Sequence, residues 1–552
     1  MKAARLKVRF KAPYNFLLLI SVTVAALVGL PVASVLANIF SGGTGATWSH
    51  LASTVLPEYV LNTLWLCSGV GFGVIVVGVA TAWLTAMHDF PGRRFFEWAL
   101  VLPLAVPAYV LAYVYTDFLQ FVGPLQTALR DFFGWSRSDY WFPDVRTLGG
   151  AVLMFVFVLY PYVYLLARTA FIERASGMLE AARTLGSGPW RSFFRVSLPL
   201  ARPAVAAGAT LALMETLADY GTVSYFGVQT FTTGIYRAWF SLGDRVAAAQ
   251  LAAALLGFVI VLLLIERGSR GRARFHNTTG RNRQQAGYRL RGWYAGAASL
   301  LCALPLVLGF LLPAGLLLRL TLTDGDAQFG ERFIALARNS FVLAGVTAII
   351  AVALALLLAY GARFSRGLIA RGLNRLVSLG YAVPGSVIAV GVLIPVTRLD
   401  NWLAGQWEAL SGHNPGLLIT GGIAALVYAY LVRFLAVALQ SVGSSLSKIT
   451  ASMDDAARSL GVGQGEALRR VHLPILRGSL FTAGLLVFVD VMKELPATLV
   501  MRPFNFDTLA TQAYTLASDE RLAEASTAAL AIVAVGLLPL IALSRQIARS
   551  RR

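Results

Sequence analysis

Long runs without a charged residue are the feature that most constrains how this chain can fold. When Asp, Glu, Lys and Arg are taken as boundaries, ten runs are at least 18 residues long, at 12–57, 59–88, 98–116, 147–167, 246–265, 292–318, 339–362, 376–397, 409–432 and 525–544. A helix needs about 20 apolar residues to cross a bilayer, so each run predicts one transmembrane helix. A chain that is 57% hydrophobic and only 13% charged is not a soluble enzyme with a polar coat.

Two further apolar segments are interrupted by charged residues. One extends from Leu198 to Val223 and the other from Leu473 to Leu499. Together with the ten runs they predict about twelve transmembrane helices and an all-α, polytopic membrane protein. A charged side chain inside a bilayer costs about 2.5 kcal/mol or more, so these two segments are where we expect function.

The net charge of +20 is distributed unevenly along the chain. Basic residues without acidic neighbours gather before the first run, in 267–291, in 363–375 and at the C-terminus. With twelve helices these four segments fall on one side of the membrane, and their excess of Lys and Arg predicts that this side is the cytoplasm. We therefore expect a multi-pass protein with cytoplasmic N- and C-termini, whose basic linker contacts lipid and not nucleic acid.

A repeat at an offset of 275 residues divides the chain into two halves. Residues 180–203 and 455–478 share eleven identical positions, which chance does not explain. The sequence therefore predicts two six-helix repeats, at 1–270 and 292–552, joined by a cytoplasmic basic linker at 271–291. Because six is an even number, the two repeats have the same orientation and are parallel, with a pathway expected between them.

The repeated segment predicts a helix–turn–helix elbow in a cytoplasmic loop, near 173–199 in the first half and near 448–474 in the second. Residues 180–185 favour a helix, and Gly186 is expected to end it. A second short helix then leads to Leu198-Pro199. The chain contains no Gly-x-x-x-x-Gly-Lys-Ser/Thr sequence, so we expect no nucleotide-binding loop in it.

The order Glu-Ala-Ala, three residues, Gly, nine residues, then Val-x-Leu-Pro resembles the EAA motif of permease subunits of bacterial ABC importers. The resemblance covers the whole chain and implies the type I ABC importer permease fold. Each elbow would act as a coupling helix that docks in a groove of a separate ATPase. The residues that the resemblance assigns to ATPase coupling are Glu180, Ala181, Ala182, Gly186, Leu198 and Pro199 in the first elbow, and Asp455, Ala456, Ala457, Gly461, Leu473 and Pro474 in the second.

The second elbow has Asp455 where the motif has Glu, which keeps the charge but shortens its reach. The two ATPase contacts are therefore expected to be unequal. The resemblance also implies the rest of the assembly. Two ATPase subunits bind and hydrolyse ATP, an extracytoplasmic binding protein delivers the substrate, and the bacterial inner membrane holds the permease. The permease itself has no enzymatic activity and no cofactor, and one copy per complex is expected.

Four acidic residues inside the predicted membrane segments form a second candidate site. They occur as two pairs with a spacing of four residues, Glu215 with Asp219 and Asp490 with Glu494. Each pair is predicted to share one helical face. A translocation pathway lined by these carboxylates and by Tyr220 favours cations, including hard metals that prefer oxygen ligands. The alternative is internal pairing, for example of Lys493 with a neighbouring carboxylate, or a position near the outer headgroups where water solvates the acids.

Residues 219–236 resemble the stretch after the fifth helix in fused permeases of ferric iron importers. That resemblance, and not the spacing of the residues, makes ferric iron the expected substrate. Thiamine permeases share the fused twelve-helix plan, and the carboxylates would also suit thiamine or a polyamine. Outside this class, an ion-driven secondary transporter leaves the repeated elbow unexplained. The five histidines lie at segment edges or in loops, so no catalytic residue and no confident metal site is predicted.

Overall fold

The computed structural model describes residues 12–42, 45–184, 188–270, 288–323, 330–364 and 368–549. Eleven helical segments in this part are long and apolar enough to cross a membrane. A twelfth span results if the bent pair Arg93–Ala105 and Ala108–Phe133 is counted as one. Each of the twelve apolar segments expected from the sequence matches one of these spans, which confirms the all-α polytopic fold.

The bend in the twelfth span follows from a proline. The two parts of the pair meet at 90°, and Pro107 stands at the break. The residue before a proline is pushed out of the helical region, and Val106 is extended, with φ −94° and ψ 118°. Pro384 repeats this arrangement in the second half, because Val383 before it is extended and helix α17 begins directly after it.

The chain folds into two compact units. Unit 1 contains Met1–Ser41 and Arg338–Phe506, and unit 2 contains Gly42–Ala337 and Asp507–Arg552. The helices of unit 1 are α1 (Ala12–Ala37), most of α15 (Glu331–Phe364), α16 (Leu368–Ser378), α17 (Gly385–Ser411), α18 (Ala424–Leu446), α19 (Ala451–Ser459), α20 (Gln464–Ala467), α21 (Leu473–Met492) and α22 (Pro496–Met501), with short 3-10 helices at Asn38–Phe40 and Leu379–Ala382 and a π-helical turn at Leu468–His472.

Unit 2 carries the larger number of elements. They are α2 (Gly45–Thr54), α3 (Leu56–Met87), β1 (His88–Asp89), α4 (Arg93–Ala99), a 3-10 turn at Leu102–Ala105, α5 (Ala108–Leu119), α6 (Pro124–Phe133), α7 (Leu148–Thr184), α8 (Pro189–Ser192), a π-helical turn at Phe193–Ser197, α9 (Leu198–Ala218), α10 (Gly221–Tyr225), α11 (Phe231–Tyr236), a π-helical turn at Arg237–Ser241, α12 (Arg245–Arg270), β2 (Tyr288–Arg289), α13 (Trp293–Leu306), a π-helical turn at Val307–Leu311, α14 (Leu312–Thr323), α23 (Leu509–Ser518) and α24 (Leu522–Arg549). The strands β1 and β2 pair in parallel.

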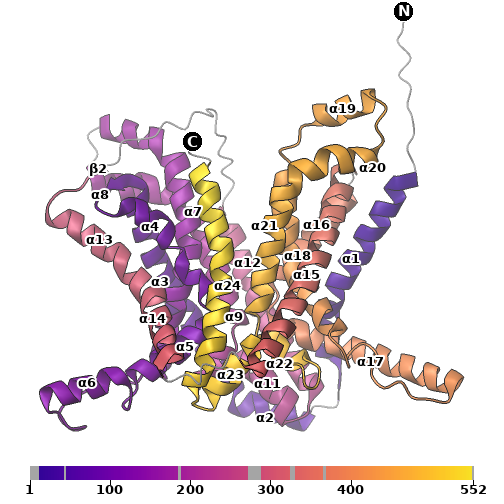
Figure 1. The fold of residues 1–552 in the computed structure, drawn as a ribbon, viewed down its shortest axis with the longest axis horizontal. Helices are drawn as coiled ribbons and strands as arrows, with labels where there is room; N and C mark the ends of the chain where they lie inside the picture. Colours follow the sequence, from indigo (N-terminus) through magenta and orange to yellow (C-terminus); the bar gives the residue numbers. More distant parts are fainter. Residues whose placement is uncertain are drawn as a thin grey trace, which may run out of the picture. The chain divides into compact units, whose positions relative to one another are not determined.

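The compact units do not coincide with the two halves of the sequence. Helix α1 comes from the first half but packs against α16 and α17 of the second, as Figure 1 shows for unit 1. Within unit 2, α14 comes from the second half and packs against α24 and against α5 of the first half. The boundaries of the sequence repeats remain a prediction, but in space the first helix of each half belongs to a unit built largely from the other half.

Glycines make these unusual packings possible, because they let helix backbones approach closely. A Cβ built on Gly391 of α17 would lie 2.4 Å from the carbonyl oxygen of Pro31 in α1. In unit 2, a Cβ on Gly536 of α24 would lie 2.6 Å from the carbonyl oxygen of Ala105. These two glycines therefore let α1 pack closely against α17, and α24 against the turn that contains Ala105, within their respective units.

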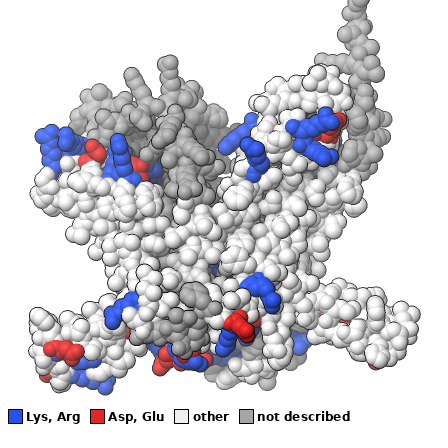
Figure 2. Space-filling view, in the orientation of Figure 1, with Lys and Arg blue, Asp and Glu red and all other residues white. Residues whose placement is uncertain are grey.

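The surface of each unit agrees with a membrane environment. Figure 2 shows the visible sides of the spans as mostly free of charged side chains, which gather at the ends of the units. Large apolar side chains such as Phe72, Ile349 and Phe481 are more than 70% exposed on the long helices. In water such a surface would be unfavourable, so it is suited to contact with lipid.

Candidate functional site

The second elbow has the predicted helix–turn–helix geometry. Helix α19 ends at Ser459, and Gly461 has a φ of 77°, a left-handed conformation that glycine adopts without strain. The amide of Gly461 donates to the carbonyl of Arg458 at 3.0 Å, and that of Val462 donates to Ala457 at 3.0 Å. The expected turn at this glycine is therefore confirmed, and it redirects the chain into α20.

Both elbows end in the same local structure. A π-helical turn, at Phe193–Ser197 in the first copy and at Leu468–His472 in the second, leads directly into the Leu-Pro that opens α9 and α21. Proline has no N–H, so it leaves one carbonyl of the preceding turn without a helical donor. In both copies the leucine before the proline donates instead across the wider turn, Leu198 to the carbonyl of Phe193 and Leu473 to that of Leu468. The repeat in the sequence is thus a repeat of backbone conformation, at the offset of 275 residues.

The first elbow is described only in part. Glu180, Ala181 and Ala182 lie in the last turns of the long helix α7, and Gly186 lies outside the described residues. The short helix α8 carries Trp190, which stacks on Phe194 with ring centroids 6.2 Å apart. These two aromatic side chains are 75% and 59% exposed, so the first elbow presents an apolar surface.

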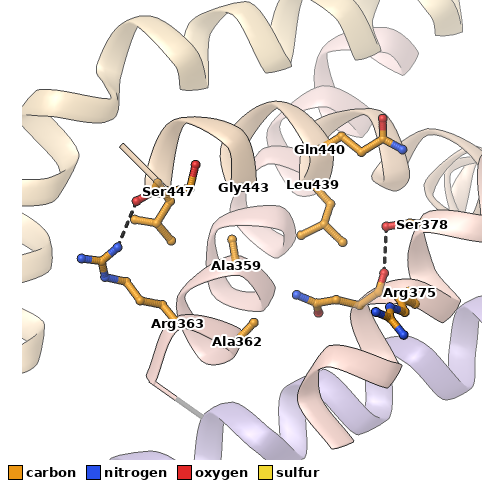
Figure 3. A pocket seen from close by; sticks show the side chains of 11 residues that line it. Ala359, Ala362, Arg363, Arg375, Ser378, Leu439, Gln440, Gly443 and Ser447 are labelled. Atoms are coloured by element: carbon orange, nitrogen blue, oxygen red, sulfur yellow. Dashed lines mark hydrogen bonds between the residues drawn. The ribbon is translucent and has the colours of Figure 1, made fainter. Parts of the chain in front are cut away.

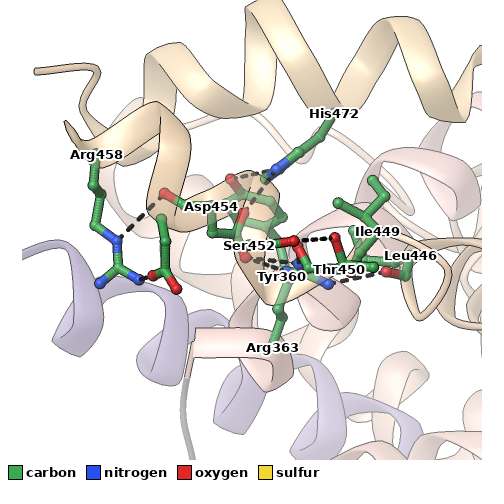
Figure 4. Close-up of polar contacts among 10 residues, drawn as sticks. Tyr360, Arg363, Leu446, Ile449, Thr450, Ser452, Asp454, Arg458 and His472 are labelled. Carbon is green, nitrogen blue, oxygen red and sulfur yellow. Dashed lines mark hydrogen bonds and ion pairs between the residues drawn. The ribbon is translucent and has the colours of Figure 1, made fainter. Parts of the chain in front are cut away.

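A polar network fixes the second elbow to its unit (Figure 4). Asp454 on α19 accepts hydrogen bonds from Nε and Nη2 of Arg363 at 3.1 and 2.6 Å. Its other oxygen lies 2.9 Å from Nε2 of the buried His472 on the π-helical turn. The hydroxyl of Tyr360 lies 3.0 Å from Nδ1 of the same imidazole. One carboxylate therefore ties α19 to α15 and to the start of α21.

Arg363 extends this network into the loop before α19. Its Nη1 donates to the carbonyl of Leu446 and its Nη2 to that of Ile449, both at 3.0 Å. A guanidinium that satisfies two backbone carbonyls and a carboxylate at once defines the position of all three groups. This cluster was not predicted from the sequence. The one difference in the sequence that points to it is His472, which stands where the first copy of the repeat has Ser197.

The exposed face of the second elbow carries the residues that the motif assigns to coupling. Asp455 is 66% exposed at its side chain and forms an ion pair with Arg458. Ala456, Gly461 and Pro474 are also exposed, whereas Ala457 is buried against the unit. Arginine side chains and a few acidic ones gather at this end of unit 1 in Figure 2. The surface available to a partner is therefore small and mixed in charge.

The four membrane carboxylates do not share helical faces, and that expectation was wrong. Helix α9 ends at Ala218, so Asp219 stands beyond it, and α21 ends at Met492, before Glu494. Each carboxylate instead accepts hydrogen bonds from amides in the first turn of the next short helix. Asp219 accepts from the amides of Thr222 and Val223 at 2.8 and 3.4 Å.

Glu494 does the same in unit 1. It accepts from the amides of Ala497 and Thr498 at 2.9 and 3.1 Å and lies 3.7 Å from Nη1 of Arg433. Asp490 pairs with Lys493 at 3.0 Å, which is the internal pairing left open by the sequence. Arg433 ends the uncharged run 409–432 in the sequence, but it lies buried in the middle of α18.

Tyr220 and Glu215 both lie in unit 2, next to Asp219. The ring of Tyr220 stacks on that of Tyr236 with centroids 3.7 Å apart, and its hydroxyl receives a hydrogen bond from Tyr514 at 3.5 Å. Glu215 is half-buried near the end of α9. Tyrosine hydroxyls and carboxylates of this unit thus lie together at one end of α9.

Comparison with known proteins matches residues 74–269 to the family described as binding-protein-dependent transport system inner membrane component. The chain is 26% identical over 546 residues to the Fe(3+)-transport system permease protein FbpB 2 of Haemophilus influenzae, covering 97% of this chain and 99% of the relative. It is 30% identical over 194 residues to the molybdenum transport system permease protein ModB of Escherichia coli K12, covering 34% of this chain and 82% of the relative. A sulfate transport system permease protein, CysW of the same strain, is 30% identical over 214 residues, which cover 38% of this chain and 69% of that protein.

Proposed function

We propose that this chain, which belongs to the family of binding-protein-dependent transport system inner membrane components, imports ferric iron. It is a transport permease and not an enzyme. The observation that supports this choice is the length of the match to the ferric permease, which covers both halves of the chain. The molybdenum and sulfate permeases match little more than a third of it. Permeases of this family work with an ATPase and a substrate-binding protein.

In this proposal, two ATPase subunits dock on the two elbows, and ATP binds to those subunits and not to this chain. The coupling residues are those of the motif, including Asp455, Ala456 and Gly461 in the second elbow. Their exposure supports the assignment, because a partner can reach them without unfolding the unit. Both elbows and both termini then lie on the cytoplasmic side of the bacterial inner membrane.

The polar network around Asp454 gives the second elbow a means of transmitting motion. Displacement of α19 by an ATPase pulls on Arg363 and His472, which belong to α15 and to the turn before α21. Charge-assisted hydrogen bonds of this kind resist stretching more than single neutral bonds do. Helices α15 and α21 therefore move with the elbow, and α21 leads to Glu494, the carboxylate that caps α22.

For the translocation pathway we retain Glu215, Asp490 and Tyr220 as candidates that contact the cation. In this proposal Asp219 and Glu494 do not contact the cation themselves. Their oxygens accept from the first amides of the short helices α10 and α22 and so hold these helices in place. Oxygen ligands suit a hard trivalent cation. The same groups suit a polyamine or thiamine, so the substrate has to be distinguished by transport.

The test of the proposed substrate is uptake into proteoliposomes that contain the full chain, its ATPase and its binding protein. We expect ATP-dependent uptake of ferric iron and none of thiamine, spermidine or molybdate. A matched preparation with an ATPase that cannot hydrolyse ATP controls for leakage. Uptake of thiamine or molybdate without iron would overturn the substrate, and uptake driven by an ion gradient without ATP would overturn the class.

A further inference from the structure

A pocket of about 400 Å³ lies in unit 1 between α15, α16 and α18, apart from the coupling surface and the membrane carboxylates. Figure 3 shows Arg363 and Arg375 on opposite sides of it. Ala359, Ala362 and Gly443 make the space, because their side chains are too short to fill it. A Cβ built on Gly443 meets no atom within 4 Å, which agrees with an open hollow.

The pocket is electropositive. None of the eleven residues that line it is acidic. The charge of Arg363 is compensated by Asp454, to which it donates two hydrogen bonds. Arg375 has no ion-pair or hydrogen-bond partner among the described residues, so its guanidinium is available to a ligand. The pocket therefore offers one uncompensated positive charge to an anion.

Neutral polar groups accompany this charge. Gln440 lines the pocket and carries an amide donor, whereas Ser447 offers its hydroxyl oxygen as an acceptor, because its O–H donates to the carbonyl of Ser444 at 2.7 Å. The side-chain oxygen of Asn374 is buried and has no hydrogen-bond partner in the described part of the chain. Its amide nitrogen makes only a long bond, at 3.4 Å, to the carbonyl of Leu358. A buried amide oxygen without a donor is costly, so a ligand that brings a hydroxyl or ammonium group would be stabilised there.

Helix α16 places the pocket at a membrane surface. Its exposed side carries Ile369 and Leu376, 66% and 43% exposed, together with Arg371 and Arg375. Its opposite side buries Val377 in the unit. A helix that exposes apolar and basic residues together lies in the interface between headgroups and acyl chains. Basic pockets between helices at that depth are suited to lipid headgroups.

We propose that this pocket binds the headgroup of an anionic phospholipid, with the phosphate on Arg375 and the hydroxyl groups of the headgroup on Asn374 and Gln440. The acyl chains then lie along Ile369 and Leu376 of α16. The lipid would sit beside Arg363, and hence beside the network that holds α19. The proposal depends on the pocket alone and holds whichever substrate the permease carries.

The test is native mass spectrometry of the full chain in detergent, titrated with phosphatidylglycerol and, separately, with phosphatidylcholine. We expect wild-type protein to bind phosphatidylglycerol at least about tenfold more tightly than phosphatidylcholine. Arg375→Gln should weaken phosphatidylglycerol binding about tenfold, the scale of one charge-assisted contact. Arg371→Gln, one turn away on the same helix and outside the pocket, is the matched control and should change it less than twofold.

A second pair of variants tests the space and not the charge. Gly443→Leu fills the pocket and should also weaken binding about tenfold. Gly372→Leu on α16 adds the same side chain outside the pocket, where a Cβ likewise meets no atom within 4 Å, and should leave binding unchanged. Variants are compared only when their melting temperature equals that of the wild-type protein. The charge pair and the space pair test separate features, so either pair alone can contradict the proposal.

Three results would overturn the proposal. Equal loss of binding in Arg375→Gln and Arg371→Gln would show that the lipid binds elsewhere, and so would unchanged binding in Gly443→Leu. The third is complete displacement of phosphatidylglycerol by millimolar inorganic phosphate, because the pocket would then hold a soluble anion and not a lipid.

Discussion

Glu494 and Asp490 lie four residues apart, but their surroundings give them different roles. Glu494 is 5% exposed, accepts from two backbone amides and from the hydroxyl of Thr498, and faces Arg433. Asp490 is partly exposed and pairs with Lys493. The first four amides of a helix have no partner within it, so a buried carboxylate at the start of α22 replaces bonds that water cannot make there.

Amide substitutions distinguish the two residues. Glu494→Gln should lower the free energy of unfolding by about 3 kcal/mol, because Arg433 keeps a buried charge that has lost its carboxylate. Asp490→Asn should change it by less, about 1 kcal/mol, since the Asp490 and Lys493 side chains both keep some contact with solvent, at 18% and 31% exposed. Unfolding of both variants in the same detergent measures the difference.

Equal stability of the two variants would contradict the capping role of Glu494. Transport then gives a separate result. Because Asp490→Asn is expected to fold normally, any loss of iron uptake in that variant reports contact with the cation and not damage to the unit.

At the scale of elements, α19 is a short helix whose position depends on its side-chain anchors. It has nine residues, too few to be stable alone in water. Asp454 faces the unit, where it accepts from Arg363 and lies 2.9 Å from Nε2 of His472, while Asp455 faces outward and pairs with Arg458. Two neighbouring carboxylates thus separate two tasks, holding the helix and presenting it to a partner.

Substituting these neighbours one at a time tests that separation. Asp454→Asn should speed hydrogen exchange of the α19 amides about tenfold, because it removes charge-assisted bonds that keep the helix in place. Asp455→Asn should change that exchange less than about twofold, but it should reduce co-purification of the ATPase. Both variants are measured in the full chain. Equal exchange in the two would show that the network does not anchor α19.

At the scale of the whole molecule, the net charge of +20 comes largely from basic residues in segments on one side of the membrane, and this distribution predicts which loops face the cytoplasm. Ser138, between α6 and α7, is exposed and is expected outside, whereas Ser452 on α19 is exposed and is expected inside. With Cys67 and Cys302 replaced by Ala, a membrane-impermeant maleimide should label Ser138→Cys in intact cells. It should label Ser452→Cys only after the membrane is opened, and the opposite pattern would reverse the topology.

Much of the fold and part of the site were predictable because they depend on local sequence. The twelve spans follow from apolar runs, and the turn at Gly461 follows from a glycine placed after a helix-forming segment. The shared helical faces of the membrane carboxylates were predicted wrongly. Spacing alone does not show that Asp219 and Glu494 leave their helices to cap the next ones.

The sequence by itself determined the number of spans, the repeat, the elbows and their resemblance to importer permeases. Each of these features depends on the residues of short, continuous segments, such as an apolar run or one copy of the motif. Only the tertiary structure decided which half α1 packs against, that Asp454 anchors the second elbow through Arg363 and His472, and that α15, α16 and α18 enclose a basic pocket. These features join residues that are up to several hundred positions apart. They depend on close backbone contacts and buried charge pairing, which no local pattern encodes.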